Sequence, residues 1–372
     1  MVVSYTNKIA NLNGFGSFCW LLLRWRGSVY KMVWRDMMVY LILYYGLSFL
    51  YRFGLTEDDK RIFEKVSQHC GHFRNLIPIS FVLGFYVSLI VSRWWGMYLS
   101  MPWPDTLAIL LATHIQGTDT RARMMRCTII RYINLVIVMT FVMIAPGVKK
   151  NFPSLQHLLD AGYLTENEKA VLEELENKTA EHKTYVPIMW ACKITDRARR
   201  EGKVTDVMAQ KTITDEILKL RGFCGELLGW DTYNIPLVYT QVVTIAVYSF
   251  FLFSVIGEQF LDPSQGYPNN LIDLYVPVFS LLQFFFYIGW LKVAESLINP
   301  FGEDDHDFEF VPLVKRHLEM SYLLADAQPT DLPTVVQEEY WDSTLSDQTE
   351  KVESTNMAAF MLANQFLPPA QV

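Results

Sequence analysis

The sequence predicts an all-α membrane protein with four membrane-spanning helices and a large helical region between the second and third spans. Four stretches of the 372-residue chain contain no charged residue and run for 15, 17, 26 and 18 residues. A helix of about 20 apolar residues spans a bilayer, and tryptophans beside the shorter stretches favour the membrane interface. Four such stretches favour a membrane protein over a soluble protein with buried core helices. They predict spans at about 33–52, 76–95, 232–257 and 274–292.

The overall composition excludes several functional classes. Hydrophobic residues make up 51% of the chain and charged residues 19%, which is more apolar than a typical soluble domain. The formal net charge of −7 argues against nucleic acid as a partner. The five cysteines are scattered without a CxxC pair, which favours reduced thiols over a disulfide framework. No Walker loop, GxSxG or HExxH motif occurs, so we do not expect an enzyme.

The distribution of basic residues predicts the topology. Five Lys and Arg residues precede the first charge-free stretch, whereas residues 258–273 contain none. Cytoplasmic segments are enriched in Lys and Arg, so we expect both termini in the cytoplasm. Residues 93–231 would then also be cytoplasmic. They carry 18 Lys and Arg and 16 Asp and Glu, the mixed charge of a folded soluble region.

A fifth charge-free stretch, residues 132–148, has basic residues at both ends. Five spans would place one terminus outside, so we expect a buried or shallowly inserted helix here. Another helix is predicted to begin at Thr165, because early acidic residues such as Glu166 and Glu168 suit a helix N-terminus. Apolar residues between Ile213 and Leu228 recur at helical spacing.

An acidic run follows the last predicted span. Residues 303–309 contain five carboxylates in seven positions. Packed carboxylates repel one another, and a hard cation such as Ca²⁺ relieves that repulsion. A solvated acidic patch or a helix N-terminus is the alternative. An EF-hand beginning at Asp304 is excluded, because Glu309 and Lys315 occupy its sixth and twelfth positions.

The second predicted span carries an apolar stripe. Ile77, Phe81 and Phe85 are four residues apart and would share one side of a helix. Such a stripe usually packs in a core. If several copies of the chain surrounded an axis, the stripe would instead form a hydrophobic constriction that gates by dewetting. Phenylalanine ring edges are weakly positive, which favours anions, and the stretch contains no Asp or Glu.

These residues resemble a known family. The segment IPISFVLGFYVSLIVSRWW (residues 77–95) is similar to the second membrane segment of the bestrophins, which are calcium-activated anion channels, mainly chloride channels, that assemble as pentamers around one central pore. The resemblance covers roughly residues 1–325, and further blocks that carry it are LLLRWRGSVYK, PWPD, IPLVYTQVV and LQFFFYIGWLKVAESLINPFGEDD. It implies a channel protomer over residues 1–325, with a cytoplasmic helical region over about 96–231, followed by a C-terminal tail over 326–372.

The resemblance also implies roles for single residues. Ile77, Phe81 and Phe85 match a hydrophobic neck, and Met208 matches a cytosolic aperture. The acidic run matches a calcium clasp, with side-chain carboxylates from Asp304 and Asp307 and backbone carbonyls from Ala10, Ser296 and Asn299. The implied partners are four further copies of the chain, the lipid bilayer, and chloride as permeant ion, at the cell membrane. An inhibitory segment is implied near Met357–Phe366, where an unstructured end is the alternative.

The chain departs from the family pattern at four places. Ser296 replaces a common Gln, His306 interrupts a run that is usually all Asp, and Met208 replaces Val or Ile at the aperture. Val142 and Met143 replace the Arg-Ser of vertebrate members. A rival function is a calcium-responsive membrane scaffold or regulator of other channels, which would conduct no current itself.

Overall fold

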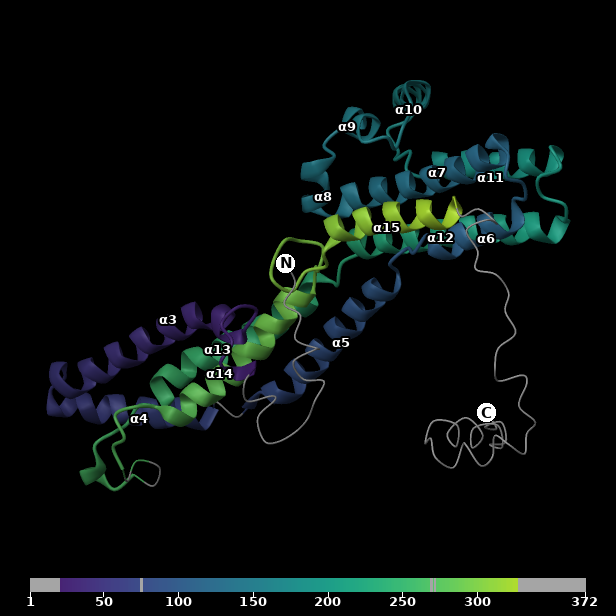
Figure 1. Cartoon of the computed structure of the whole chain (residues 1–372). Coiled ribbons are helices and arrows are strands. Elements are labelled where there is room, and N and C mark those ends of the chain that lie inside the picture. The colour runs from purple at the N-terminus through teal and green to yellow at the C-terminus, as the bar shows by residue number, and fades with distance from the viewer. Residues whose placement is uncertain (1–20, 74–75, 268–269, 271, 327–372) are drawn as a thin grey trace, which may run out of the picture. The chain divides into compact units, whose positions relative to one another are not determined.

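The computed structural model describes residues 21–73, 76–267, 270 and 272–326, and this part of the chain contains helices and no strand. The predicted all-helical fold is therefore confirmed for these residues (Figure 1). Ala10 and the segment Met357–Phe366 lie outside the described residues.

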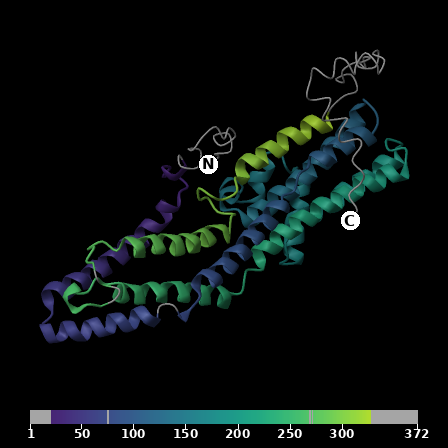
Figure 2. The same cartoon turned by 90° about the horizontal axis from the view of Figure 1, so that it is seen from below.

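One group of helices surrounds an aromatic cluster. Tyr40, Phe251 and Phe284 lie at its centre, with ring centroids of Phe251 and Phe284 4.7 Å apart. Figures 1 and 2 show the helices of this group next to one another. The group consists of α3 (Val29–Phe49) with its π-helical extension η1 (Leu50–Gly54), α4 (Glu57–Phe73), α5 (Ile79–Leu99), α13 (Leu237–Gly257) and α14 (Val278–Leu297).

Four members of this group correspond to the four predicted spans. Helices α3, α5, α13 and α14 are each long and apolar enough to cross a membrane. Only 17% to 33% of their most apolar windows is buried within the chain. A short 3₁₀ turn, η3 (Pro263–Gln265), lies in the connection between α13 and α14. The remaining apolar surface of these helices is available to lipid or to other subunits.

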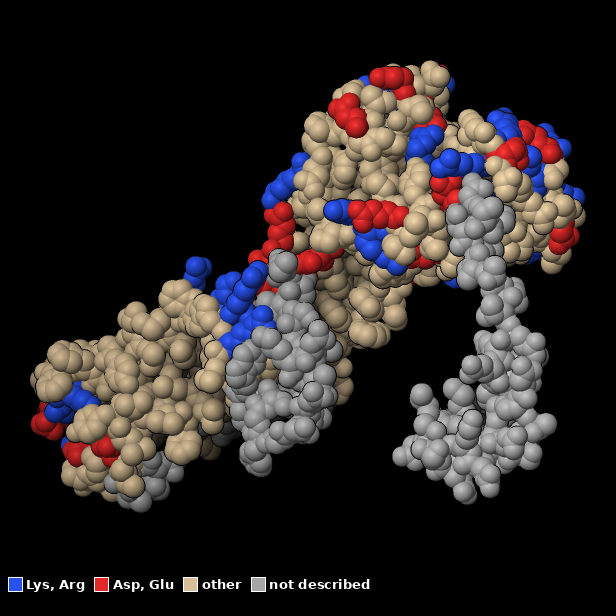
Figure 3. Space-filling view, viewed as in Figure 1, with Lys and Arg blue, Asp and Glu red and all other residues tan. Residues whose placement is uncertain are grey.

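The second group surrounds α7. Ile129, Ile133 and Phe141 of this helix are 1% exposed or less. Figure 3 shows Lys, Arg, Asp and Glu spread over the face of this group, whereas the first group is mostly free of them on that face. The group consists of α6 (Asp105–His114), α7 (Thr120–Ile144), α8 (Pro146–Asn151), α9 (Leu155–Asp160), α10 (Glu166–Lys178), α11 (Val186–Arg200), α12 (Val207–Thr232) and α15 (Phe310–Ala325).

Helix α7 contains most of the fifth charge-free stretch. It is long and apolar enough to span a membrane, yet 67% of its most apolar window is buried within the chain. It packs against α6, α11, α12 and α15. This agrees with the expectation of a buried helix, although the helix begins earlier than the stretch, at Thr120, and ends at Ile144.

Helix α4 was not predicted, because its sequence is charged and lacks a long apolar run. Asp58 and Asp59 in its first turn favour the positive end of the helix dipole. Its buried carboxylate, Glu64, accepts hydrogen bonds from Tyr51 at 2.8 Å and Tyr267 at 2.7 Å and pairs with Arg61. These partners offset the cost of burying the charge, so an amphipathic helix packs against α13.

The predicted start at Thr165 is confirmed. Thr165 caps α10, and the carboxylate of Glu168 accepts the Thr165 backbone N–H at 2.9 Å, which completes a capping box. Arg131 and Tyr132 of α7 also donate to Glu168, at 2.6 to 2.7 Å. Burial alone would raise the pKa of Glu168, but these hydrogen bonds lower it to about 2.

Candidate pore and cation site

Helix α5 presents one apolar side to its own subunit and leaves another side exposed. Phe81 and Phe85 are 65% and 59% exposed, and their ring centroids lie 4.7 Å apart in an edge-on arrangement. The inward side of the helix consists of Ile79, Leu83, Tyr86, Val87 and Ile90, all buried. The sequence stripe is therefore not core packing within the subunit.

The first member of the stripe lies outside the helix. Ile77 is 46% exposed but precedes α5, which begins at Ile79 after Pro78. Pro78 lacks a backbone N–H and restricts the residue before it, so the helix does not extend back to Ile77. The expectation that all three residues share one helical stripe therefore holds only for Phe81 and Phe85.

The C-terminal end of α5 is held against the C-terminal end of α12. Arg93 donates from Nη1 to the carbonyl of Tyr233 at 2.9 Å and from Nη2 to that of Trp230, and its guanidinium lies 5.1 Å from the Trp230 ring centre. At Gly96 an added Cβ would lie 2.9 Å from the same ring, so only glycine permits this approach. A cation at a helix C-terminus is favourable because the last carbonyls carry partial negative charge.

Met208 lies at the opposite end of α12. It occupies the first helical turn, is 63% exposed, and its carbonyl accepts a hydrogen bond from Thr212. A rise of 1.5 Å per residue separates it from Trp230 by about 33 Å along the helix. The predicted aperture residue and the neck helix are thus connected through α12 but are not neighbours.

The acidic loop, residues 299–309, folds into compact turns. Phe308 N–H donates to the carbonyl of Pro300 at 2.8 Å, and Asp304 N–H donates to Asp307 Oδ2 at 2.7 Å. Asp307 is only 6% exposed. A Cβ at position 302 would lie 2.5 Å from Asp307 Oδ2, so Gly302 allows the carboxylate to turn inward.

The backbone of Asp304 therefore contacts the carboxylate of Asp307, the other predicted side-chain ligand. Burial raises the pKa of Asp307, and the nearby charge of Asp304 acts in the same direction. The Asn299 side chain accepts the N–H of Phe301 at 3.3 Å, and the Ser296 hydroxyl donates to the carbonyl of Val293. No group of three or more His, Cys, Asp and Glu side chains within the described residues is arranged to hold a metal.

Other carboxylates of the loop pair with basic side chains. Asp305 lies 2.7 Å from Lys31 and 3.3 Å from Arg26, and the hydrogen bond from Lys31, followed by that from Arg26, lowers its pKa to about 2. Glu303 pairs with Lys150 of α8. The loop is thereby attached to the first turn of α3 and the segment before it in the first helix group, and to α8 in the second.

Two contacts that the sequence did not predict connect the loop to α5. The ring of Phe308, next to Asp307, lies 5.4 Å from the ring of Trp94 and 6.3 Å from that of Tyr98. Trp94 and Tyr98 could be recognised in the sequence as aromatic residues near the end of a predicted span. Their partner Phe308 lies in a distant segment of the chain, so the contact could not be predicted. The candidate cation site thus contacts the helix that carries the exposed phenylalanines.

Comparisons with known proteins identify the family. The family model described as "Bestrophin, RFP-TM, chloride channel" matches residues 1–327. Mouse bestrophin-2 is 49% identical over 343 residues, covering 92% of this chain and 67% of the relative, and human bestrophin-1 is 46% identical, covering 92% and 58%. The chain thus spans between about half and two thirds of such relatives.

A solved structure shows the same fold. A bacterial bestrophin homolog from Klebsiella pneumoniae is 16% identical, with a TM-score of 0.55, and the match covers 81% of this chain and 100% of the other. The family contains channels, which agrees with the expectation that this chain is not an enzyme. On the extent of the match and on the identity to its relatives, the chain belongs to the bestrophin family of chloride channels.

Proposed function

We propose that this chain is the subunit of a calcium-activated anion channel, a homopentamer with one central pore in the cell membrane and both termini in the cytoplasm. The observation that carries the proposal is the exposed side of α5. Phe81 and Phe85 project from a helix whose opposite side is buried in its own subunit. Several copies around an axis would bring these residues together as a narrow apolar neck.

Anion preference follows from the chemistry along α5. The positive ring edges of Phe81 and Phe85 would face the ion path. The charge-free stretch from 76 to 92 contributes no carboxylate, and Arg93 adds a cation at its end. A second constriction would lie at Met208, whose long flexible side chain makes a softer aperture than the family's Val or Ile.

The residues present fit a calcium ion. Asp304 and Asp307 supply hard oxygen ligands. Ser296 lies in the last turn of α14, where backbone carbonyls have no partner within the helix, and Asn299 follows that end. Ala10 would add a carbonyl from outside the described residues. Bound calcium would supply the positive charge that the buried Asp307 carboxylate lacks.

The route from the cation site to the neck is the Phe308 contact with α5. A cation changes the gate only if it binds the open-competent arrangement more tightly than the closed one. Holding the acidic loop in one arrangement would fix Phe308 against Trp94 and thus the end of the neck helix.

The decisive experiment is reconstitution of purified protein in planar bilayers under a chloride gradient with buffered calcium. We expect currents that reverse near the chloride equilibrium potential and that appear on addition of calcium to the cytoplasmic side. Calcium binding without current would instead support the rival function, a membrane scaffold or regulator of other channels.

A further inference from the structure

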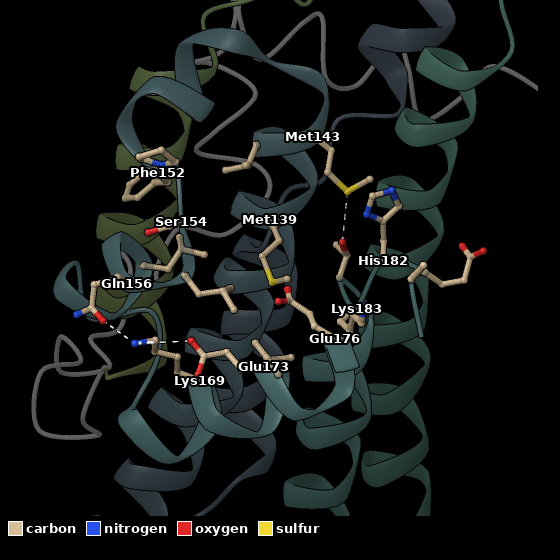
Figure 4. A pocket seen from close by; sticks show the side chains of 18 of the residues that line it. Met139, Met143, Phe152, Ser154, Gln156, Lys169, Glu173, Glu176, His182 and Lys183 are labelled. Carbon is tan, nitrogen blue, oxygen red and sulfur yellow. Dashed lines mark hydrogen bonds and ion pairs between the residues drawn. The ribbon is translucent and has the colours of Figure 1, made fainter. Parts of the chain in front are cut away.

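A cavity lies in the second helix group, away from the acidic loop and from α5. It is partly open to solvent and has a volume of about 730 Å³, which is within the range of small-molecule sites, and α7, α9, α10 and the segment after α10 line it (Figure 4). We refer to it as the α7–α10 cavity.

One side of the α7–α10 cavity is apolar. Met139, Val142 and Met143 contribute it from α7, with Leu158 from α9 and Leu172 from α10. Neither Val142 nor Met143 carries a charge, and the thioether of Met143 adapts to ligands of different shape.

The opposite side is charged, and its lysines are already engaged. Lys169 Nζ donates to Gln156 at 2.6 Å and lies 3.8 Å from Glu173. Lys183 Nζ donates to the carbonyl of Thr179 at 2.5 Å. Both cations are thereby attached to the cavity wall.

Glu176 differs from these lysines. Figure 4 shows its carboxylate turned into the cavity beside Met139. Among the described residues, no Lys or Arg lies within ion-pair distance of it. A carboxylate next to an apolar wall attracts a ligand with a cationic head and a hydrocarbon body, and it repels a fatty acid of the same length.

We propose that the α7–α10 cavity binds primary alkylammonium ions. The ammonium group pairs with Glu176, and the alkyl chain lies along Met139, Val142 and Met143. The binding surface is separate from the proposed neck and cation site, so it does not depend on them.

Octylammonium is the probe, titrated calorimetrically against the full-length protein in lipid nanodiscs, with empty nanodiscs subtracted. We expect saturable binding, and no competition from octanoate, which has the same chain length and the opposite charge. Glu176→Gln should weaken binding about tenfold, since it removes one charged hydrogen bond. Val142→Arg should weaken it at least as much, because a cation and its bulk enter the apolar wall.

Glu174→Gln is the matched control, because Glu174 lies on the same helix, pairs with Lys178 and does not line the cavity. Its affinity should equal that of the unmodified protein. Equal binding of octanoate, or equal affinities for Glu176→Gln and Glu174→Gln, would overturn the proposal. A long-chain amine supplied in the nanodisc lipid, compared with octylammonium in the buffer, distinguishes a membrane-derived ligand from a soluble one.

Discussion

Helices α5 and α7 are both long and apolar, yet the chain uses them differently. The most apolar window of α7 has a higher mean hydropathy than that of α5, but other helices of the same chain bury most of it. α5 keeps most of its apolar window exposed, with Phe81 and Phe85 projecting outward. Hydropathy therefore does not distinguish a helix buried in the core of the subunit from one that leaves its apolar surface exposed. What distinguishes them is whether apolar neighbours from the same chain cover the surface.

The strongest test of this contrast acts on the neck. Replacing Ile77, Phe81 and Phe85 together with Ala should produce current in calcium-free solution, because a wider and less apolar constriction stays wet. Planar-bilayer recording measures this calcium-free current. Val91→Ala is the control, because Val91 is exposed on another side of α5. A triple variant that stays shut without calcium would show that the neck is not the gate.

The converse test acts on the core of α7. Phe141 is fully buried and meets Phe310 of α15 edge-on at 4.7 Å. Phe141→Ala should lower the free energy of unfolding by about 3–5 kcal/mol, the usual cost of a large core truncation. Phe81→Ala should change it by less than about 1 kcal/mol, since its ring is mostly exposed. Denaturant unfolding in detergent compares the two variants. Equal losses in the free energy of unfolding would show that Phe81 is as important for folding as Phe141.

A third test concerns how α7 is attached to α10. Because the pKa of Glu168 is about 2 in the folded protein, below its ordinary value of 4.5, the carboxylate stabilises the fold above its unfolded pKa. This contribution, at most about 3 kcal/mol, should be lost as the pH falls from about 4.5 toward 2. Thermal unfolding of Glu168→Gln should therefore depend less on pH over that window than the unmodified protein.

Glu166→Gln, in the first turn of the same helix, should keep the original pH dependence. If Glu166→Gln and Glu168→Gln behave alike, the ion pair with Arg131 is not the cause.

The smallest expected effect concerns the loop that contacts both helix groups. Asp304→Ala should shift calcium activation to about tenfold higher concentration or more, because one carboxylate ligand is lost, with little change in folding. Asp305→Asn is a useful comparison, because Asp305 pairs with Arg26 and Lys31. Patch recordings at graded calcium concentrations measure the shift. An unchanged calcium response of Asp304→Ala would contradict the proposed role of Asp304 as a calcium ligand.

Much of this architecture was predictable because it depends on local sequence. Charge-free length located α3, α5, α13 and α14, and the early acidic residues after Thr165 located the start of α10. Charge counting also indicated that residues 132–148 are buried. Helix α4 could not be found in this way, since its stability depends on partners of Glu64 that come from distant segments.

The features of the candidate site can likewise be divided into those that the local sequence predicts and those that depend on contacts between distant segments. The sequence alone determined which residues are available as candidates: the paired phenylalanines of α5, the acidic run and the apolar Val142-Met143 pair. Only the tertiary structure decided which of them meet. It placed Ile77 outside the helix, turned Asp307 inward over Gly302, and brought Phe308 against Trp94. Helix periodicity and charge are local properties of the chain, whereas these contacts join segments whose approach depends on the packing of the whole subunit.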